Sequence, residues 1–275
     1  MPDKPTQWSS KYASIFQDES VVAAYQHRPP YPPETFTFLS SLIPPTVARR
    51  TVLDAGCGTG FIARPFAPFV DQVDAVDISE EMIRMGQALP GGNRPNIRWV
   101  SASIETAHLN GPYALIVAAA SLHWLDWERA LPRFAVHLAP NCVLALVEER
   151  TQPNPWDASI SPISGRYSMN TDFAPYDMTT VAAELEQRRL FQLQGCHETR
   201  PVSFQQSVAA WVESVHARNG FSRDRMDAAA AAACDAELRS AIRPYCRDDI
   251  VAQNIGARIL WGAPLSGTPP SKETR

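Results

Sequence analysis

Three glycines stand at alternate positions, Gly56, Gly58 and Gly60, and they follow the apolar run Thr51-Val52-Leu53 and one carboxylate, Asp54. A short run of β-branched and apolar residues is typical of a buried parallel strand. Glycine tolerates the positive φ angles of a tight turn and lets a ligand approach the backbone closely. The stretch therefore predicts a strand, a turn and a helix, with a cofactor lying over the turn.

The spacing of the glycines narrows the kind of cofactor. A dinucleotide fingerprint would place its third glycine at position 61, which is Phe61, and a phosphate-binding loop would contain a lysine that is absent. The carboxylate of Asp54 would also repel pyrophosphate. It suits a cationic ligand that carries ammonium and hydroxyl groups.

The stretch resembles the first motif of class I S-adenosylmethionine (SAM) dependent methyltransferases, which reads apolar-Asp/Glu-x-Gly-x-Gly-x-Gly. In that family the acidic residue and the glycine backbone hold the methionine end of SAM, and S-adenosylhomocysteine is the product. The resemblance implies cofactor contacts from the following residues: Asp54, Ala55, Gly56, Cys57, Gly58 and Gly60.

A second carboxylate, Asp77, ends the next expected strand, residues 73–77. A carboxylate at such a strand tip can accept hydrogen bonds from both ribose hydroxyls, in SAM enzymes as in NAD enzymes. Ser79 then predicts a capped helix start. The resemblance implies that Ile78 and Met82 pack on the adenine, although Met82 could equally be a core residue.

The third expected strand, residues 96–100, departs from the family pattern. The family usually follows it with Gly-Asp/Ser-Ala-Glu, whose polar group meets the adenine amine, whereas this chain reads Ser-Ala-Ser-Ile-Glu over 101–105. The acid expected at position 102 is missing. We expect Ser103, or the backbone of Ser103 and Ile104, to serve the adenine instead.

The segment Tyr25-x-x-Arg28-Pro29-x-Tyr31-Pro32 resembles the N-terminal segment of a trans-aconitate-methyltransferase-like subgroup of small-molecule enzymes. The resemblance implies that this segment folds over SAM. Arg28 is the candidate partner of the SAM carboxylate, because its planar guanidinium can bind that group in bidentate fashion. Tyr25 and Tyr31 are further cofactor candidates. The alternative is an ordinary surface arginine beside a proline turn.

His123 follows the fourth expected strand, residues 113–120, whose end includes Ala119, another cofactor candidate. Ligands bind at the carboxyl ends of strands in open α/β sheets. A neutral imidazole there could act as a general base. It could instead position the ligands, since a His-Trp pair recurs in the resembled subgroup, and plain packing is the third possibility.

Aromatic residues in and beyond the core are the candidates for contacts with the acceptor. Aromatic faces attract a sulfonium by cation–π interaction and offer apolar walls to an acceptor. Residues 151–178 are rich in Pro, Ser, Tyr and Trp without clear period, which is typical of a lid or binding loop. The candidate substrate-binding residues are Trp124, Trp127, Trp156, Tyr167, Tyr176 and Trp211.

Alternating strands and helices predict an α/β fold with a Rossmann-like, mostly parallel seven-stranded sheet, helices on both faces and a helical cap. We expect an N-terminal helical lid segment at 1–45, frayed over 1–12, and a SAM-binding core at 46–150. Residues 151–264 should complete the sheet and carry cap insertions at about 151–178 and 205–244. A disordered tail is expected at 265–275.

Composition sets bounds on the partners. The net charge of −4 gives no electrostatic reason to expect nucleic acid or an anionic membrane. The five cysteines form no pairs at metal spacing, so no metal is expected, and their odd number suggests reduced thiols. A soluble cytoplasmic protein, as a monomer or homodimer, is the expectation.

These observations favour a SAM-dependent methyltransferase that acts on a small-molecule acceptor through oxygen or nitrogen, including a carboxylate. Two alternatives stay open: a noncatalytic SAM-binding or interaction module, and a methyltransferase acting on carbon or sulfur in specialised metabolism. An oxidoreductase on a dinucleotide scaffold is disfavoured by Phe61 at the third glycine position.

Overall fold

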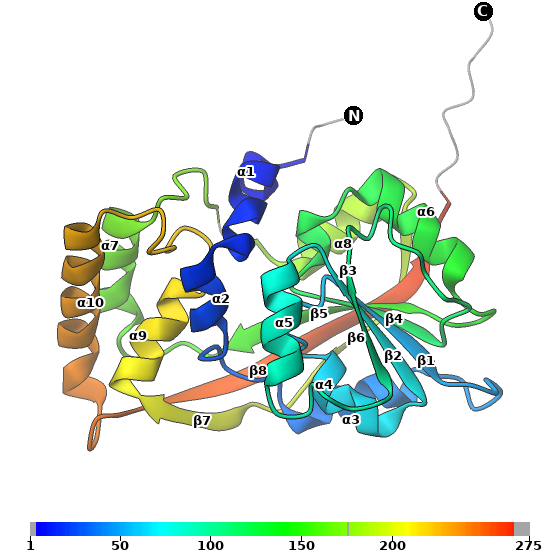
Figure 1. The fold of residues 1–275 in the computed structure, drawn as a ribbon, viewed down its shortest axis with the longest axis horizontal. Helices are drawn as coiled ribbons and strands as arrows, with labels where there is room; N and C mark the ends of the chain where they lie inside the picture. Colours follow the sequence, from blue (N-terminus) through cyan, green and yellow to red (C-terminus); the bar gives the residue numbers. More distant parts are fainter. Residues whose placement is uncertain (1–3, 175, 267–275) are drawn as a thin grey trace, which may run out of the picture.

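The computed structural model describes residues 4–174 and 176–266. Figure 1 shows a twisted sheet flanked by helices, with a helical cap at one end of the molecule. The strands are β1 (Thr51–Ala55), β2 (Gln72–Asp77), β3 (Ile97–Ser101), β4 (Leu115–Ala119), β5 (Leu144–Thr151), β6 (Phe191–Glu198), β7 (Val202–Ser207) and β8 (Ile250–Pro264). The helices are α1 (Ser10–Ala13), α2 (Glu19–Tyr25), α3 (Pro33–Ser41), α4 (Ala63–Phe66), α5 (Glu80–Ala88), α6 (Trp127–His137), α7 (Asp157–Tyr167), α8 (Met178–Gln187), α9 (Val208–His216) and α10 (Ala228–Ile242).

The strand order is β3-β2-β1-β4-β5-β8-β6, and β7 pairs with β8. The first five strands of this order are parallel, whereas β8 runs antiparallel to β5, β6 and β7. The predicted mostly parallel Rossmann-like sheet is therefore confirmed. The described residues form eight strands rather than seven, because β6 and β7 lie one after the other along the same edge of the long β8.

Helices cover both faces of this sheet, because its central strands are buried on both sides. One face packs against α6 and α8, through residues such as Phe134 and Leu185. The other face packs against α3, α4 and α5, through residues such as Leu39, Phe66 and Ile83. This double cover explains why the β1 and β4 segments read as continuous apolar runs.

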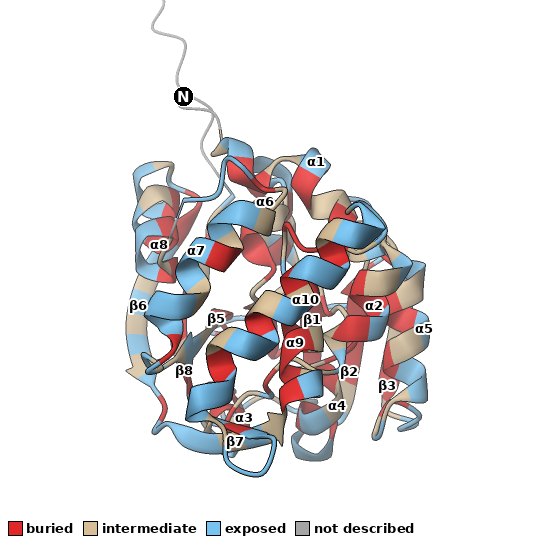
Figure 2. Cartoon of the chain, turned by 90° about the vertical axis from the view of Figure 1, so that its left-hand side faces the viewer, coloured by how far each residue is buried: buried red, intermediate tan, exposed pale blue. Residues whose placement is uncertain are grey.

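The cap consists of α7, α9 and α10, which pack around a separate apolar cluster with Trp156, Trp211 and Leu238. Figure 2 shows that α7 and α10 turn mainly exposed residues outward. The helix α7 was not expected from the sequence, because Pro162 and Gly165 mask its period. The helical insertion expected at about 205–244 corresponds to α9 and α10.

Residues 4–25 lie between the cap and the sheet (Figure 1). The frayed segment expected over 1–12 is wrong for its described part, because Trp8 and Tyr12 are buried. Residues 1–3 and the tail from 267 lie outside the described residues. No helix of the described chain is both long and apolar enough to cross a bilayer.

Candidate active site

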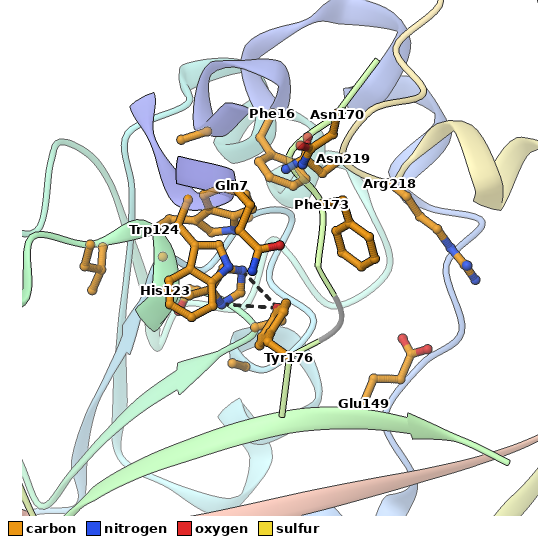
Figure 3. Close-up of a pocket in the computed structure, with 18 of the residues that line it drawn as sticks. Gln7, Phe16, His123, Trp124, Glu149, Asn170, Phe173, Tyr176, Arg218 and Asn219 are labelled. Carbon is orange, nitrogen blue, oxygen red and sulfur yellow. Dashed lines mark hydrogen bonds between the residues drawn. The ribbon is translucent and has the colours of Figure 1, made fainter. Parts of the chain in front are cut away.

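A cavity of about 1200 Å³ opens at the carboxyl ends of the five parallel strands. The strand order reverses between β1 and β4, and crevices at such switch points are where open α/β sheets bind ligands. Residues that end or follow each strand line it, among them Gly56, Asp77, Ser103, Ala119 and Glu149. We call this space the chamber; Figure 3 shows the part that lies under the cap.

The glycine turn forms the floor of the chamber. Gly56 and Gly58 line it with φ angles of 72° and 52°. A Cβ on Gly56 would lie 2.6 Å from Cβ of Ser121, whose hydroxyl donates to the Ala55 carbonyl at 2.6 Å. Gly60 has a φ of 80° and packs against Trp99, where an added Cβ would lie 2.5 Å from the ring. The turn therefore requires glycine for both its conformation and its contacts.

Asp77 anchors the turn to β2. Its carboxylate accepts hydrogen bonds from the backbone N–H groups of Gly58 at 2.7 Å and Ser79 at 2.9 Å. Burial raises the pKa of Asp77, while these hydrogen bonds act in the opposite direction. A carboxylate has about four acceptor positions, so Asp77 keeps capacity to accept from ligand hydroxyls in the chamber.

Asp54 lies behind the turn rather than on the chamber wall. Its carboxylate is 1% exposed and accepts the Ala63 N–H at 3.0 Å, which ties β1 to the start of α4. Burial, aided by the nearby charge of Asp77, raises the pKa of Asp54 to about 7. Four of the expected cofactor residues do not line the chamber: Asp54, Ala55, Cys57 and Gly60. They support the turn from behind.

The expected adenine side is formed by Ile78, Met82, Ser103 and Ile104, which all line the chamber. Ile78 is 62% exposed despite its apolar side chain, while Met82 is buried. Ser79 caps α5 by accepting the Met82 N–H at 3.2 Å, as the sequence predicted. The hydroxyl of Ser103 donates to the carboxylate of Glu105, so a neighbouring acid is present although position 102 lacks one.

The N-terminal segment brings Tyr25 and Arg28 to the chamber. Arg28 lies 5.3 Å from the centre of the Tyr25 ring and 3.5 Å from the Glu149 carboxylate. Burial opposes the charged guanidinium, but Tyr25 and Glu149 outweigh it and raise the pKa of Arg28. Tyr31 is not among the chamber-lining residues and packs against the α3 side of the core instead.

His123 is buried in a group of aromatic rings, with Trp8, Trp124 and Tyr176 around it. The Tyr176 hydroxyl lies 3.2 Å from its Nε2 and 3.4 Å from its Nδ1, as Figure 3 shows. Burial, and then the positive charges of Lys4 and Arg28, lower the pKa of His123 to about 3. The imidazole is therefore neutral at pH 7 and only a weak base.

Most of the aromatic residues expected to contact an acceptor do line the chamber. The structure brings together Trp124, Trp127, Trp156, Tyr176 and Trp211. Tyr167 is the exception, because its hydroxyl donates to Glu237 at 2.8 Å in the contact between α7 and α10. Because this hydrogen bond holds Tyr167 against α10, Tyr167 does not line the chamber.

Several chamber residues were missed by the sequence analysis: Gln7, Trp8, Phe16, Glu149, Asn170, Phe173, Arg218 and Asn219. Glu149 follows the apolar run of β5, so its place at a strand end was a signal. The others come from segments without a motif. The described residues contain no group of three or more His, Cys, Asp or Glu side chains placed to hold a metal ion.

Comparison with known proteins identifies the domain. Residues 52–141 match the family model described as a methyltransferase domain. A methyltransferase of Mycobacterium tuberculosis named as uncharacterized is 37% identical over 111 residues, covering 40% of this chain and 54% of the relative. A malonyl–acyl-carrier-protein O-methyltransferase of Halalkalibacterium halodurans is 35% identical over 83 residues, covering 28% of this chain and 30% of that protein. The chain spans about half the length of the first of these relatives.

Solved structures agree on the fold. A proposed type II methyltransferase of Anaeromyxobacter dehalogenans superposes with a TM-score of 0.60 at 23% identity, covering 86% of this chain and 97% of that one. A phosphoethanolamine N-methyltransferase of Haemonchus contortus, solved with S-adenosylhomocysteine, gives 0.52 at 13% identity, covering 92% and 59%. The solved structures show that this chain shares the fold of methyltransferases, and the family model matches residues 52–141 as a methyltransferase domain.

Proposed function

We propose that the chain transfers a methyl group from SAM to a small-molecule acceptor bound under the cap. The observation that carries the proposal is the continuity of the chamber. It runs from the glycine turn and Asp77 to the aromatic residues of the cap, so a cofactor and a second molecule fit in one space.

The residues present fit SAM. Gly56 and Gly58 leave room for close approach at the turn, and Asp77 keeps acceptor capacity for ribose hydroxyls. Exposed Ile78 and buried Met82 offer apolar contacts to an adenine. Arg28 is the candidate partner of the carboxylate, and binding there would compete with its contact to Glu149.

SAM supplies an activated methyl group, so the main tasks of the protein are alignment and exclusion of water. Trp8, Trp124 and Tyr176 surround His123 and restrict water on that side of the chamber. With its pKa near 3, His123 is a better positioning group than a base. A carboxylate acceptor would need no base, whereas a hydroxyl acceptor would need one from another group.

The test has two stages. Calorimetry and thermal shift should show that SAM and S-adenosylhomocysteine bind and stabilise the protein, whereas NAD does not. A labelled-methyl screen over small acids, phenols, amines and thiols should then give a methylated product. Binding of SAM without transfer to any class would favour the noncatalytic alternative, and transfer to a thiol alone would favour the sulfur alternative.

A further inference from the structure

The strongest unexplained feature of the chamber is the side chain of Phe173, in the loop between α7 and α8. Phe173 is 59% exposed, although it lines the chamber. It belongs to none of the apolar clusters that the described residues form, and no ring of a described residue contacts it. Removal of apolar surface from water is favourable, so a ligand that covers this ring gains from the contact.

The other aromatic side chains of the chamber are covered by protein atoms. The ring centres of Phe16 and Trp124 lie 5.4 Å apart, and those of Trp156 and Trp211 lie 6.4 Å apart. All of these rings are buried or half-buried, whereas Phe173 is exposed. Packing within the protein therefore explains the other rings and does not explain Phe173.

The exposed ring stands on a backbone that hydrogen bonds hold in place. The Asp172 carboxylate accepts the Tyr12 hydroxyl at 2.8 Å, and the Ala174 N–H donates to the side-chain oxygen of Gln7 at 2.8 Å. These two bonds lie on either side of Phe173 in the sequence, and both join its loop to the N-terminal segment. Figure 3 shows the ring pointing into the chamber. The loop therefore presents an open aromatic ring at a defined place.

A second exposed apolar side chain lines the chamber at its other end. Of the large apolar side chains that are exposed in the described part of the chain, Ile78 and Phe173 are the two that line the chamber. Ile78 lies on the expected adenine side, where a planar ring would cover it. The same arrangement at Phe173 indicates that a second planar ligand binds under the cap.

The size of the chamber allows this second ligand to be large. A pocket for one drug-sized molecule measures about 300–1,000 Å³. The chamber measures about 1200 Å³, so a ligand of several rings fits beside SAM. A two- or three-carbon acceptor would leave much of that space unfilled and the ring of Phe173 uncovered.

We propose that Phe173 is the platform on which the acceptor stacks, and that the acceptor is a planar aromatic molecule of two or more rings. Two aromatic rings attract one another in offset-stacked or edge-to-face geometry, beyond the gain from burying apolar area. Phe173 therefore selects for planar aromatic acceptors over saturated molecules of the same size. This assignment rests on the proposed function, since it places the acceptor in the same chamber as SAM.

The probes are 2-naphthol and decahydro-2-naphthol, titrated by calorimetry with S-adenosylhomocysteine saturating. Both share one carbon skeleton and one hydroxyl, but only 2-naphthol is planar and aromatic. The wild-type protein should bind 2-naphthol about three- to tenfold more tightly. Phe173→Ala should remove this preference and lower the affinity for 2-naphthol by about tenfold. Phe173→Leu keeps an apolar side chain, so it should lose the preference and keep part of the affinity.

Phe69→Ala is the matched control, because Phe69 is 41% exposed and does not line the chamber. It should keep the preference, and circular dichroism checks that every variant is folded. A wild type that binds both alcohols equally, or that does not bind 2-naphthol, would overturn the inference, as would a Phe173→Ala protein that keeps the preference. Failure to bind S-adenosylhomocysteine would instead count against the proposed function, and the same titrations without it would still test Phe173.

Discussion

The two halves of the chamber satisfy their polar groups in different ways. At the sheet edge, Asp54 and Asp77 both accept backbone N–H groups, and the glycine turn bonds back to β2 through Gly56 at 2.8 Å. Under the cap, Asn170 and Asn219 have buried polar atoms that lack partners among the described residues.

This difference indicates what each half is built to do. A turn whose backbone is held by hydrogen bonds to β2 and to Asp77 is preorganised, so a cofactor can bind without rearranging it. A wall with unsatisfied amides gains most when a ligand of matching polarity arrives, and it discriminates against ligands that leave those amides unpaired. The sheet edge would thus provide affinity for SAM, while the cap would provide selectivity for the acceptor.

The largest expected effect is on SAM binding by Asp77→Ala. The change removes the acceptor of two candidate ribose hydrogen bonds, each worth about 1.5–3 kcal/mol for a charged partner. We expect SAM affinity to fall by about 100-fold or more in calorimetry. Glu80→Ala is the control, because Glu80 is an exposed carboxylate three residues away. Unchanged affinity in a folded Asp77→Ala protein would contradict the assignment of the sheet edge.

Gly60→Ala should destabilise the turn. Its φ of 80° and the 2.5 Å approach to Trp99 combine backbone strain with overpacking, together about 2–5 kcal/mol in the free energy of unfolding. Gly165→Ala in α7 is the matched control, since an added Cβ meets nothing within 4 Å there and should stabilise by about 0.5–1 kcal/mol. Denaturant titration measures both, and equal effects would contradict the constraint that the structure indicates at Gly60.

His123→Gln should make the fold less sensitive to acid. The pKa of His123 is lowered to about 3 by burial, whereas an unfolded chain titrates histidine near about 6.5. As the pH falls from about 6.5 towards 3, the unfolded state takes up a proton that the folded state excludes, so stability is lost. Between pH 7.5 and pH 5, the wild type should lose about 2 kcal/mol more than the variant.

The same variant separates positioning from base catalysis. With a positioning role, turnover should fall by less than about tenfold and show no histidine inflection between pH 5.5 and 8.5. A loss of about 10²–10⁴-fold, with a rate that rises through a pKa near 6.5 in the wild type, would restore the base role.

The smallest effect concerns the N-terminal segment as a lid. Lys4 donates to the Leu125 carbonyl at 2.7 Å, Ala174 donates to Gln7 at 2.8 Å, and Tyr12 donates to Asp172 at 2.8 Å. Bound SAM should slow protease cleavage near residues 10–35. Tyr12→Phe should raise cleavage a few-fold, as expected for one hydrogen bond worth about 1 kcal/mol. Tyr245→Phe, at an exposed tyrosine, is the control; cleavage that SAM does not slow would refute the lid.

The sequence alone predicted the parts of the protein that depend on local order. The strand, glycine turn and helix around Gly58 are contiguous in the sequence. The turn requires positive φ angles, and glycine is the residue type that adopts them most readily. The positions of Asp77 at a strand end and of Ser79 at a helix start were also predictable, because both depend only on neighbouring residues in the sequence. Of these residues, Gly58 and Asp77 line the chamber.

The half of the chamber under the cap was decided by tertiary structure and could not be predicted from the sequence. Asn170, Arg218 and Trp8 lie far apart in the sequence, and they line one chamber only because the turn after α9, the loop before α8 and the N-terminal segment lie over the sheet. Their spacing carries no period or motif, so no local pattern could reveal them. Tyr167 is the opposite case, because the sequence predicted it as a substrate-binding residue. The packing of α7 on α10 instead places its hydroxyl against Glu237. Burial and partner choice are properties of the folded chain, and they determine which polar groups are left free to bind an acceptor.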